Sequence, residues 1–173
     1  QQMSVQGSIL QTKFTAWAGT LGKPAIKKAV KTNPSAKAHE FILLESAEQS
    51  KYLMSEAEET LAAELTLSGG SAFGKLQGTL TSQMTVDFEL DGEVKKMPMP
   101  ALINLRSHPD ESVRRRGYEA ENKAWAGVQE TLAACLNGVK GETLILDRKR
   151  GREDNVHASI DSARIDRATL EAM

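Results

Sequence analysis

Residues 107–151 constrain the fold most, because their pattern predicts one long helix followed by a basic turn. Pro109 fits the first helical position, where its missing amide hydrogen costs nothing, and Asp110 and Glu111 lie at the positive end of the helix dipole. Apolar residues then recur in steps of mostly three and four, which keeps one helix face on a core. They are Val113, Ala120, Ala124, Val128, Leu132, Leu136 and Val139.

Gly141 is the predicted end of this helix, because it follows the last apolar position and glycine accepts left-handed backbone geometry without strain. A helix that ends there would be about 45–50 Å long. A compact domain of 173 residues cannot enclose that length. We therefore expect the helix to pack against something larger.

The rest of the chain also has mostly helical patterns. Helices are expected over residues 8–19 and 36–50, with interruptions at residues 22–24 and 33–35. Residues 41–44 are apolar almost all round, so we expect them in the centre of the core. Further helices are expected from the Ser55/Glu58 capping box to about Leu65, around Phe73 to Met84, and after a cap at Asp166.

Residues 85–97 are the exception and predict a β-hairpin. Val86, Phe88 and Leu90 alternate with polar residues, and Asp91-Gly92 is a strong two-residue turn signal. This register places Asp87 opposite Lys96, a pair worth at most about 1 kcal/mol. Because a lone hairpin is barely stable in water, its apolar face must lie on helices.

These patterns predict a mainly α fold: a helical domain with one long amphipathic helix and a two-stranded β-hairpin insert. A chain of 173 residues can bury one core over residues 1–173, or form two lobes, 1–105 and 106–173, that share a seam. Gln1 and Gln2 do not resemble a natural start, and the last helix stops after about two turns. We therefore expect a piece of a longer protein.

Charge and cysteine content narrow the functional class. The 22 basic and 23 acidic residues nearly balance, so no net field draws the whole molecule to nucleic acid or to a membrane. The single Cys135 allows no intrachain disulfide and fits a reducing compartment. No apolar run reaches the length of a membrane span. We expect a cytoplasmic protein without nucleic-acid or membrane partners.

Residues 69–75 have the glycine and lysine spacing of a phosphate-binding loop. That loop needs a hydroxyl after the lysine to hold magnesium, but Leu76 stands there, and the residues before the loop continue a helix rather than a strand. We interpret the segment as a turn between two helices, with Ser71 as a cap, and expect no ATPase.

No residue qualifies as a catalytic group or a metal ligand. His39-Glu40 begins like the HExxH metalloprotease motif, which sets two histidines on one helix face, but Leu43 occupies the second histidine position. His108 and His157 have no partner motif, and Cys135 fits a small core residue. The sequence therefore assigns no catalytic, metal, cofactor or substrate-binding residue.

Two basic clusters remain, residues 114–116 and residues 148–150 with Arg152. The first is best interpreted as a solvated helix face paired with Asp110, Glu111, Glu119 and Glu121. The second lies in a predicted loop and has the better claim to contact a ligand or a partner domain.

Several short motifs follow one another in order between residues 40 and 173. They are residues 51–59, 65–69, 71–76, 114–120, 136–142, 150–151 and 165–170. This series resembles the N-terminal region of oligoendopeptidase F-like zinc metallopeptidases, in the thimet oligopeptidase superfamily. One position departs from the family pattern, since Arg152 stands where relatives usually carry an aromatic residue.

The resemblance implies a non-catalytic N-terminal domain that packs beside a downstream catalytic domain of the same chain and forms part of the wall of an oligopeptide-binding cleft. It places the zinc and its HExxH motif in the full-length parent and no cofactor in this segment, which we expect to be inactive alone. The alternative is a free-standing helical interaction module without catalytic activity. An exposed apolar face would let the isolated piece self-associate.

Overall fold

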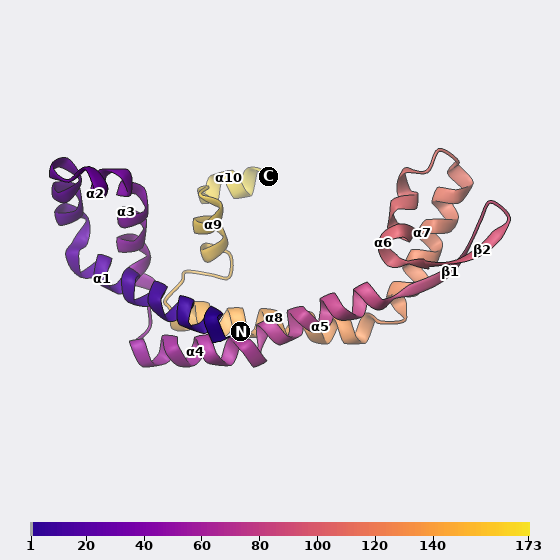
Figure 1. Cartoon of the computed structure of the whole chain (residues 1–173), viewed down its shortest axis with the longest axis horizontal. Coiled ribbons are helices and arrows are strands. Elements are labelled where there is room, and N and C mark those ends of the chain that lie inside the picture. Colours follow the sequence, from indigo (N-terminus) through magenta and orange to yellow (C-terminus); the bar gives the residue numbers. More distant parts are fainter. Residues whose placement is uncertain (1) are drawn as a thin grey trace. The chain divides into compact units, whose positions relative to one another are not determined.

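The computed structural model describes residues 2–173, so Gln1 lies outside the described part of the chain. The described residues form helices and a single two-stranded antiparallel hairpin (Figure 1). This confirms the predicted mainly α fold with a hairpin insert. The chain divides into two compact units. The first runs up to Ser68 and resumes at Gly141–Met173; the second is Gly69–Lys140.

The first unit is entirely helical. Its elements are α1 (Gln2–Thr32), α2 (Pro34–Ala38), α3 (Glu40–Gln49), η1 (Ser50–Tyr52), α4 (Glu56–Ser68), the end of α8 (Gln129–Lys149) from Gly141 on, α9 (His157–Ala163) and α10 (Arg167–Ala172). The longest helix, α1, is kinked at Gly22, whose φ is 71°. The predicted interruptions at residues 22–24 and 33–35 are therefore both confirmed.

The core of this unit lies where α1 packs on α3 (Figure 1). It contains Ala18, Ile26, Val30 and Ala47, with Leu43 and Leu44 partly buried against it. The expectation that residues 41–44 are all central to the core is wrong for Phe41 and Ile42, which are 54% and 46% exposed. A helix with one packed side can bury only part of an apolar run.

Two of the predicted capping signals are confirmed, whereas Pro109 lies before the N-cap Asp110 of α7 rather than at the first helical position. The Ser55 hydroxyl accepts from the Glu58 amide at 3.3 Å, and the Glu58 carboxylate accepts from the Ser55 amide at 3.1 Å, as a capping box requires. Asp166 caps α10 by accepting from the Thr169 amide at 2.8 Å. These short-range bonds explain why the two helix starts were predictable.

The second unit builds its core around the hairpin. Its elements are α5 (Gly70–Gln83), β1 (Thr85–Leu90), β2 (Glu93–Pro98), α6 (Met99–Asn104), η2 (Leu105–Ser107), α7 (Glu111–Ala126) and the first half of α8. Asp87 pairs with Lys96, which confirms the predicted register. Phe88 is buried with residues of the following helices, which confirms the predicted packing of the hairpin face. These are Met99, Leu102, Leu105 and Val113.

The helix predicted over residues 109–141 is two helices. The first helix, α7, ends at its C-cap Gly127, whose amide donates to the carbonyls of Lys123 and Ala124. The second, α8, continues to Lys149. Gly141 lies inside α8, so its prediction as the terminator is wrong, because one glycine in a helix costs only about 1 kcal/mol. The helix ends before Gly151, which has the left-handed φ of 70°.

The division expected between residues 105 and 106 falls inside the second unit, within η2. There, α6 and α7 pack together on the hairpin and share one core. None of the helices described over residues 2–173 combines the length and the apolar character needed to cross a bilayer.

Candidate functional site

The basic turn after α8 makes a two-pronged ion pair with a buried carboxylate. Arg150 Nε donates to Glu59 Oε1 at 3.0 Å, and its Nη2 donates to Oε2 at 2.6 Å. The Glu59 side chain is 5% exposed and the Arg150 side chain 31%. The Met54 amide donates to the same carboxylate at 3.1 Å. The pair joins the end of α8 to the first turn of α4.

The Glu59 carboxylate stays charged in this setting. Burial by itself raises the pKa of Glu59, but the hydrogen bonds from Arg150 and from the Met54 amide outweigh burial, so the pKa lies below its ordinary value. The Arg150 pKa is raised by the same hydrogen bond. Both directions favour the ionised pair, as expected for a structural link.

Arg152 makes a second internal network. Its Nη1 donates to Asp161 at 2.5 Å and its Nη2 donates to Gln49 at 2.7 Å. The guanidinium lies over the Tyr52 ring at 3.9 Å, and the His157 ring meets Tyr52 edge-on at 5.0 Å. Residue 152 is the position that is usually aromatic in the resembled family. Here Arg152 occupies it and stacks on the ring of Tyr52.

These contacts correct the interpretation of the second basic cluster as a surface for a ligand or a partner domain. Arg150 and Arg152 bind α4, α3 and α9 of their own unit, whereas Arg148 and Lys149 remain exposed. Glu59 lies 91 residues from Arg150 and Gln49 lies 103 residues from Arg152, whereas Asp161 is only nine residues from Arg152. No local pattern could have identified Glu59 or Gln49 as partners.

The first basic cluster also differs from its predicted pairing. Arg114 donates to the carbonyls of His108 and Pro109, and Arg116 donates to the Glu89 carbonyl. Glu121 is 4% exposed and is held by Arg106 and by the Trp125 indole at 3.1 Å. Arg114 and Arg116 therefore bind backbone carbonyls, of the segment before α7 and of β1 respectively, while the buried Glu121 carboxylate is paired with Arg106.

Residues 69–75, Cys135 and His157, which the sequence singled out, each lie within or between helices of the fold. The turn predicted over residues 69–75 is confined to Gly69, the N-cap of α5; residues 70–75 already belong to α5, so the predicted cap at Ser71 is wrong. Cys135 is buried, and His157 lies within 3.7 Å of Asp161. Across residues 2–173, no group of three or more His, Cys, Asp and Glu residues is arranged to hold a metal ion.

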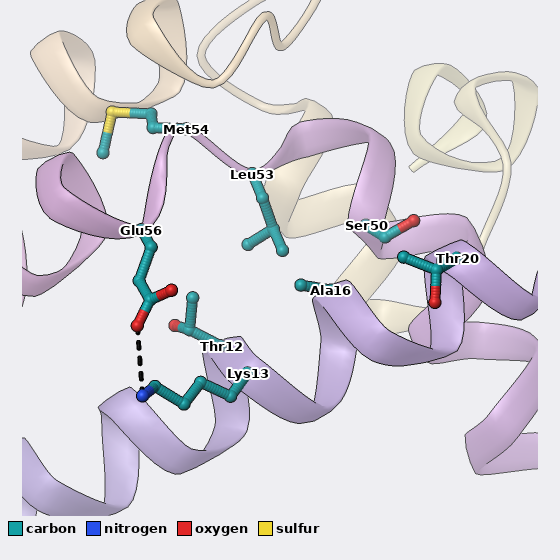
Figure 2. Close-up of a pocket in the computed structure, with 9 residues that line it drawn as sticks. Thr12, Lys13, Ala16, Thr20, Ser50, Leu53, Met54 and Glu56 are labelled. Carbon is teal, nitrogen blue, oxygen red and sulfur yellow. Dashed lines mark ion pairs between the residues drawn. The ribbon is translucent and has the colours of Figure 1, made fainter.

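A groove along α1 is the candidate functional site of the first unit (Figure 2). It measures about 380 Å³ and lies between α1, η1 and the start of α4; we call it the α1 groove. Its lining residues are Thr12, Lys13, Ala16, Gly19, Thr20, Ser50, Leu53, Met54 and Glu56. Sequence reasoning missed it, because these residues come from three separate segments and have no common motif.

Close packing and one exposed ion pair define the shape of the α1 groove. A Cβ atom on Gly19 would lie 2.3 Å from the Ser50 hydroxyl oxygen, so α1 and η1 approach as closely as a glycine allows. Lys13 Nζ lies 3.1 Å from Glu56 Oε1, shown as the dashed line in Figure 2, with side chains 58% and 71% exposed. An ion pair this exposed is worth less than about 1 kcal/mol and opens easily.

The chemistry of the α1 groove suits a short polar chain with apolar side groups. The Thr20 hydroxyl donates to the Trp17 carbonyl, and the Ser50 hydroxyl donates to the Ala47 carbonyl. Both hydroxyl oxygens can therefore still accept a hydrogen bond. Ala16, Leu53 and Met54 add apolar surface. The groove thus combines acceptors, apolar contacts and two opposite charges, the set that a peptide can use.

Residues 19–85 match the family model for the N-terminal domain of peptidase family M3, described as Oligopeptidase F. No curated protein and no solved structure matches the chain. The family match confirms the resemblance predicted from the ordered motifs: this segment is similar to the N-terminal region of oligopeptidase F-like peptidases. The motifs at residues 51–59, 65–69 and 71–76 lie within it.

Proposed function

We propose, from the similarity of residues 19–85 to the oligopeptidase F N-terminal region, that this chain is the non-catalytic helical flank of a longer zinc metallopeptidase and that its α1 groove walls part of the oligopeptide cleft. The family match is the observation that carries the proposal. Six of the nine residues lining the groove lie in the matched segment. They are Gly19, Thr20, Ser50, Leu53, Met54 and Glu56.

The role of the groove in this proposal is binding and orientation. Lys13 and Glu56 would exchange their mutual ion pair for the charged groups of a peptide, at little cost because both are exposed. The Thr20 and Ser50 oxygens would accept peptide amide hydrogens. The described residues supply no set of zinc ligands, so we assign the hydrolytic chemistry to the downstream catalytic domain of the parent chain.

Filling the groove in the full-length parent tests this role. Replacing Ala16 by tryptophan should raise KM for oligopeptides about three- to tenfold with kcat nearly unchanged, because the lost contacts bind substrate and transition state alike. Peptide hydrolysis at a series of substrate concentrations gives both constants. Gln6→Trp, an exposed position on the same helix outside the groove, is the matched control. Equal KM values for the two variants would exclude the groove from the cleft wall.

A free-standing interaction module is the alternative, and one observation favours it. Leu10, Trp17 and Leu21 recur at helical spacing along α1 and are 70%, 51% and 41% exposed. An apolar stripe of this kind is typical of a helix that packs on a partner. In the peptidase account the same stripe meets the catalytic domain; in the alternative it binds another protein or a second copy.

A further inference from the structure

The start of this chain carries a net positive charge, because the acidic residues all lie further along the sequence. Residues 1–39 contain six lysines and no aspartate or glutamate, although the whole chain is nearly neutral. Two of these lysines are paired, Lys13 with Glu56 and Lys23 with Glu48. No salt bridge within the described part of the chain engages the other four, all of which are exposed. They are Lys27, Lys28, Lys31 and Lys37.

Three of the unpaired lysines surround one hollow of about 490 Å³. Lys27 and Lys31 reach it from α1, Lys37 from α2, and Glu40 from the start of α3. The remaining lining residue is Val30, which is 8% exposed and belongs to the core between α1 and α3. The hollow, which we call the lysine hollow, is therefore built on the packed centre of its unit.

Helix capping accounts for only part of this charge. Lys31 lies in the last turn of α1 and Lys37 in the last turn of α2, where cations favour the negative end of the helix dipole. That effect fades within the last turn, whereas Lys27 lies five residues before the end of α1 at Thr32. Stabilisation of helix ends therefore does not explain why three lysines line one hollow.

We propose that the lysine hollow docks a carboxylate-rich segment of a partner protein. Three ammonium groups around one concave surface complement the side-chain carboxylates of an acidic segment. The half-buried Glu40 carboxylate can accept a backbone amide hydrogen of the docked segment. This proposal does not depend on the peptidase assignment.

Two other anionic classes fit less well. The described residues that line the hollow include no arginine, which binds phosphates through two hydrogen bonds, and no aromatic ring, which stacks on nucleic-acid bases. Membrane-binding basic patches usually hold about four to eight cationic residues next to apolar anchors. The lysine hollow has three, with a glutamate among them.

Binding of an acidic probe peptide to the whole chain tests the proposal. The probe is a fluorescein-labelled peptide of alternating glutamate and serine, titrated by anisotropy at low salt. The triple variant Lys27→Gln, Lys31→Gln, Lys37→Gln should bind at least about tenfold more weakly, because three exposed charge pairs are lost. The triple variant Lys75→Gln, Lys123→Gln, Lys140→Gln changes the net charge equally at exposed positions elsewhere and should stay within about twofold.

Two further arms decide between sources of binding. Replacing Lys27, Lys31 and Lys37 by arginine keeps the charge and should therefore retain the affinity for the peptide. Circular dichroism of each triple variant checks that it is folded. Oligouridylate and vesicles containing phosphatidylserine serve as competitors. Equal losses in the two glutamine triples, no binding of the peptide, or tighter binding of either competitor would overturn the proposal.

Discussion

Replacing Arg150 by alanine is expected to lower the free energy of unfolding of the first unit by about 3 kcal/mol. The variant leaves the Glu59 carboxylate, 5% exposed, with the Met54 amide as its remaining donor. An unpaired buried charge typically costs about 3–5 kcal/mol, and the lower end applies because the Arg150 side chain is itself 31% exposed.

Urea denaturation followed by Trp17 fluorescence measures this loss. The chain has two tryptophans, one in each unit, so a Trp125→Phe background makes Trp17 the reporter for the first unit. Arg167→Ala is the matched control, since Arg167 and Asp154 are 43% and 41% exposed, so solvent screens their pair and its loss should change stability little. Similar small losses in both variants would contradict the structural role assigned to the Glu59–Arg150 pair.

The same pair gives the first unit a dependence on pH. The pKa of Glu59 is lowered in the folded protein, so its contribution to stability is present above the unfolded pKa of about 4.3 and is lost as pH falls through the folded pKa. Without Arg150, burial raises the pKa of Glu59, and protonation then relieves the buried charge. The stability gap between the wild type and the Arg150→Ala variant should therefore narrow in acid.

Replacing Leu102 by alanine should destabilise the second unit by about 2–5 kcal/mol. Leu102 is 1% exposed and lies in the cluster that joins the hairpin to α6 and α7. The loss has two parts, the transfer of the removed carbons to water and the cavity that remains. Phe88 and Val113 border the site and belong to different elements, which limits the collapse of that cavity.

Trp125 fluorescence in a Trp17→Phe background reports this change, because Trp125 packs against the same cluster. Leu76→Ala serves as the control: Leu76 is 47% exposed on α5 in the same unit, and we expect its loss to be about 1 kcal/mol or less. A Leu102 variant as stable as the Leu76 variant would show that the hairpin does not depend on this core.

The features predicted correctly from the sequence are local. The Ser55/Glu58 capping box, the Asp166 cap and the pairing of Asp87 with Lys96 each depend on residues within about a dozen positions of one another. A single side-chain bond or a tight turn sets their geometry. They therefore needed no knowledge of tertiary packing.

The errors arise where packing overrides local preference. Gly141 has the sequence context of a helix end, but α8 continues through it to Lys149. Phe41 belongs to an apolar run, yet it is 54% exposed, because the packed side of α3 carries Leu43, Leu44, Ser46 and Ala47 instead. The Glu59–Arg150 pair joins residues 91 positions apart, which no pattern in one sequence indicates.

The functional prediction had a different basis. The order of short motifs indicated a peptidase N-terminal region, and the family match over residues 19–85 confirms that similarity. The α1 groove was not predictable, since Thr12, Ser50 and Glu56 meet only after α1 packs against η1 and α4. Motif order can thus identify a family when the site itself has no sequence signature.

The sequence of the coding region beyond Met173 tests the central claim most directly. If this chain is the flank of an oligopeptidase F-like enzyme, the reading frame continues and encodes an HExxH motif, with a further glutamate ligand downstream of it. A stop codon directly after Met173, or a long continuation without that motif, would contradict the account and favour the interaction module.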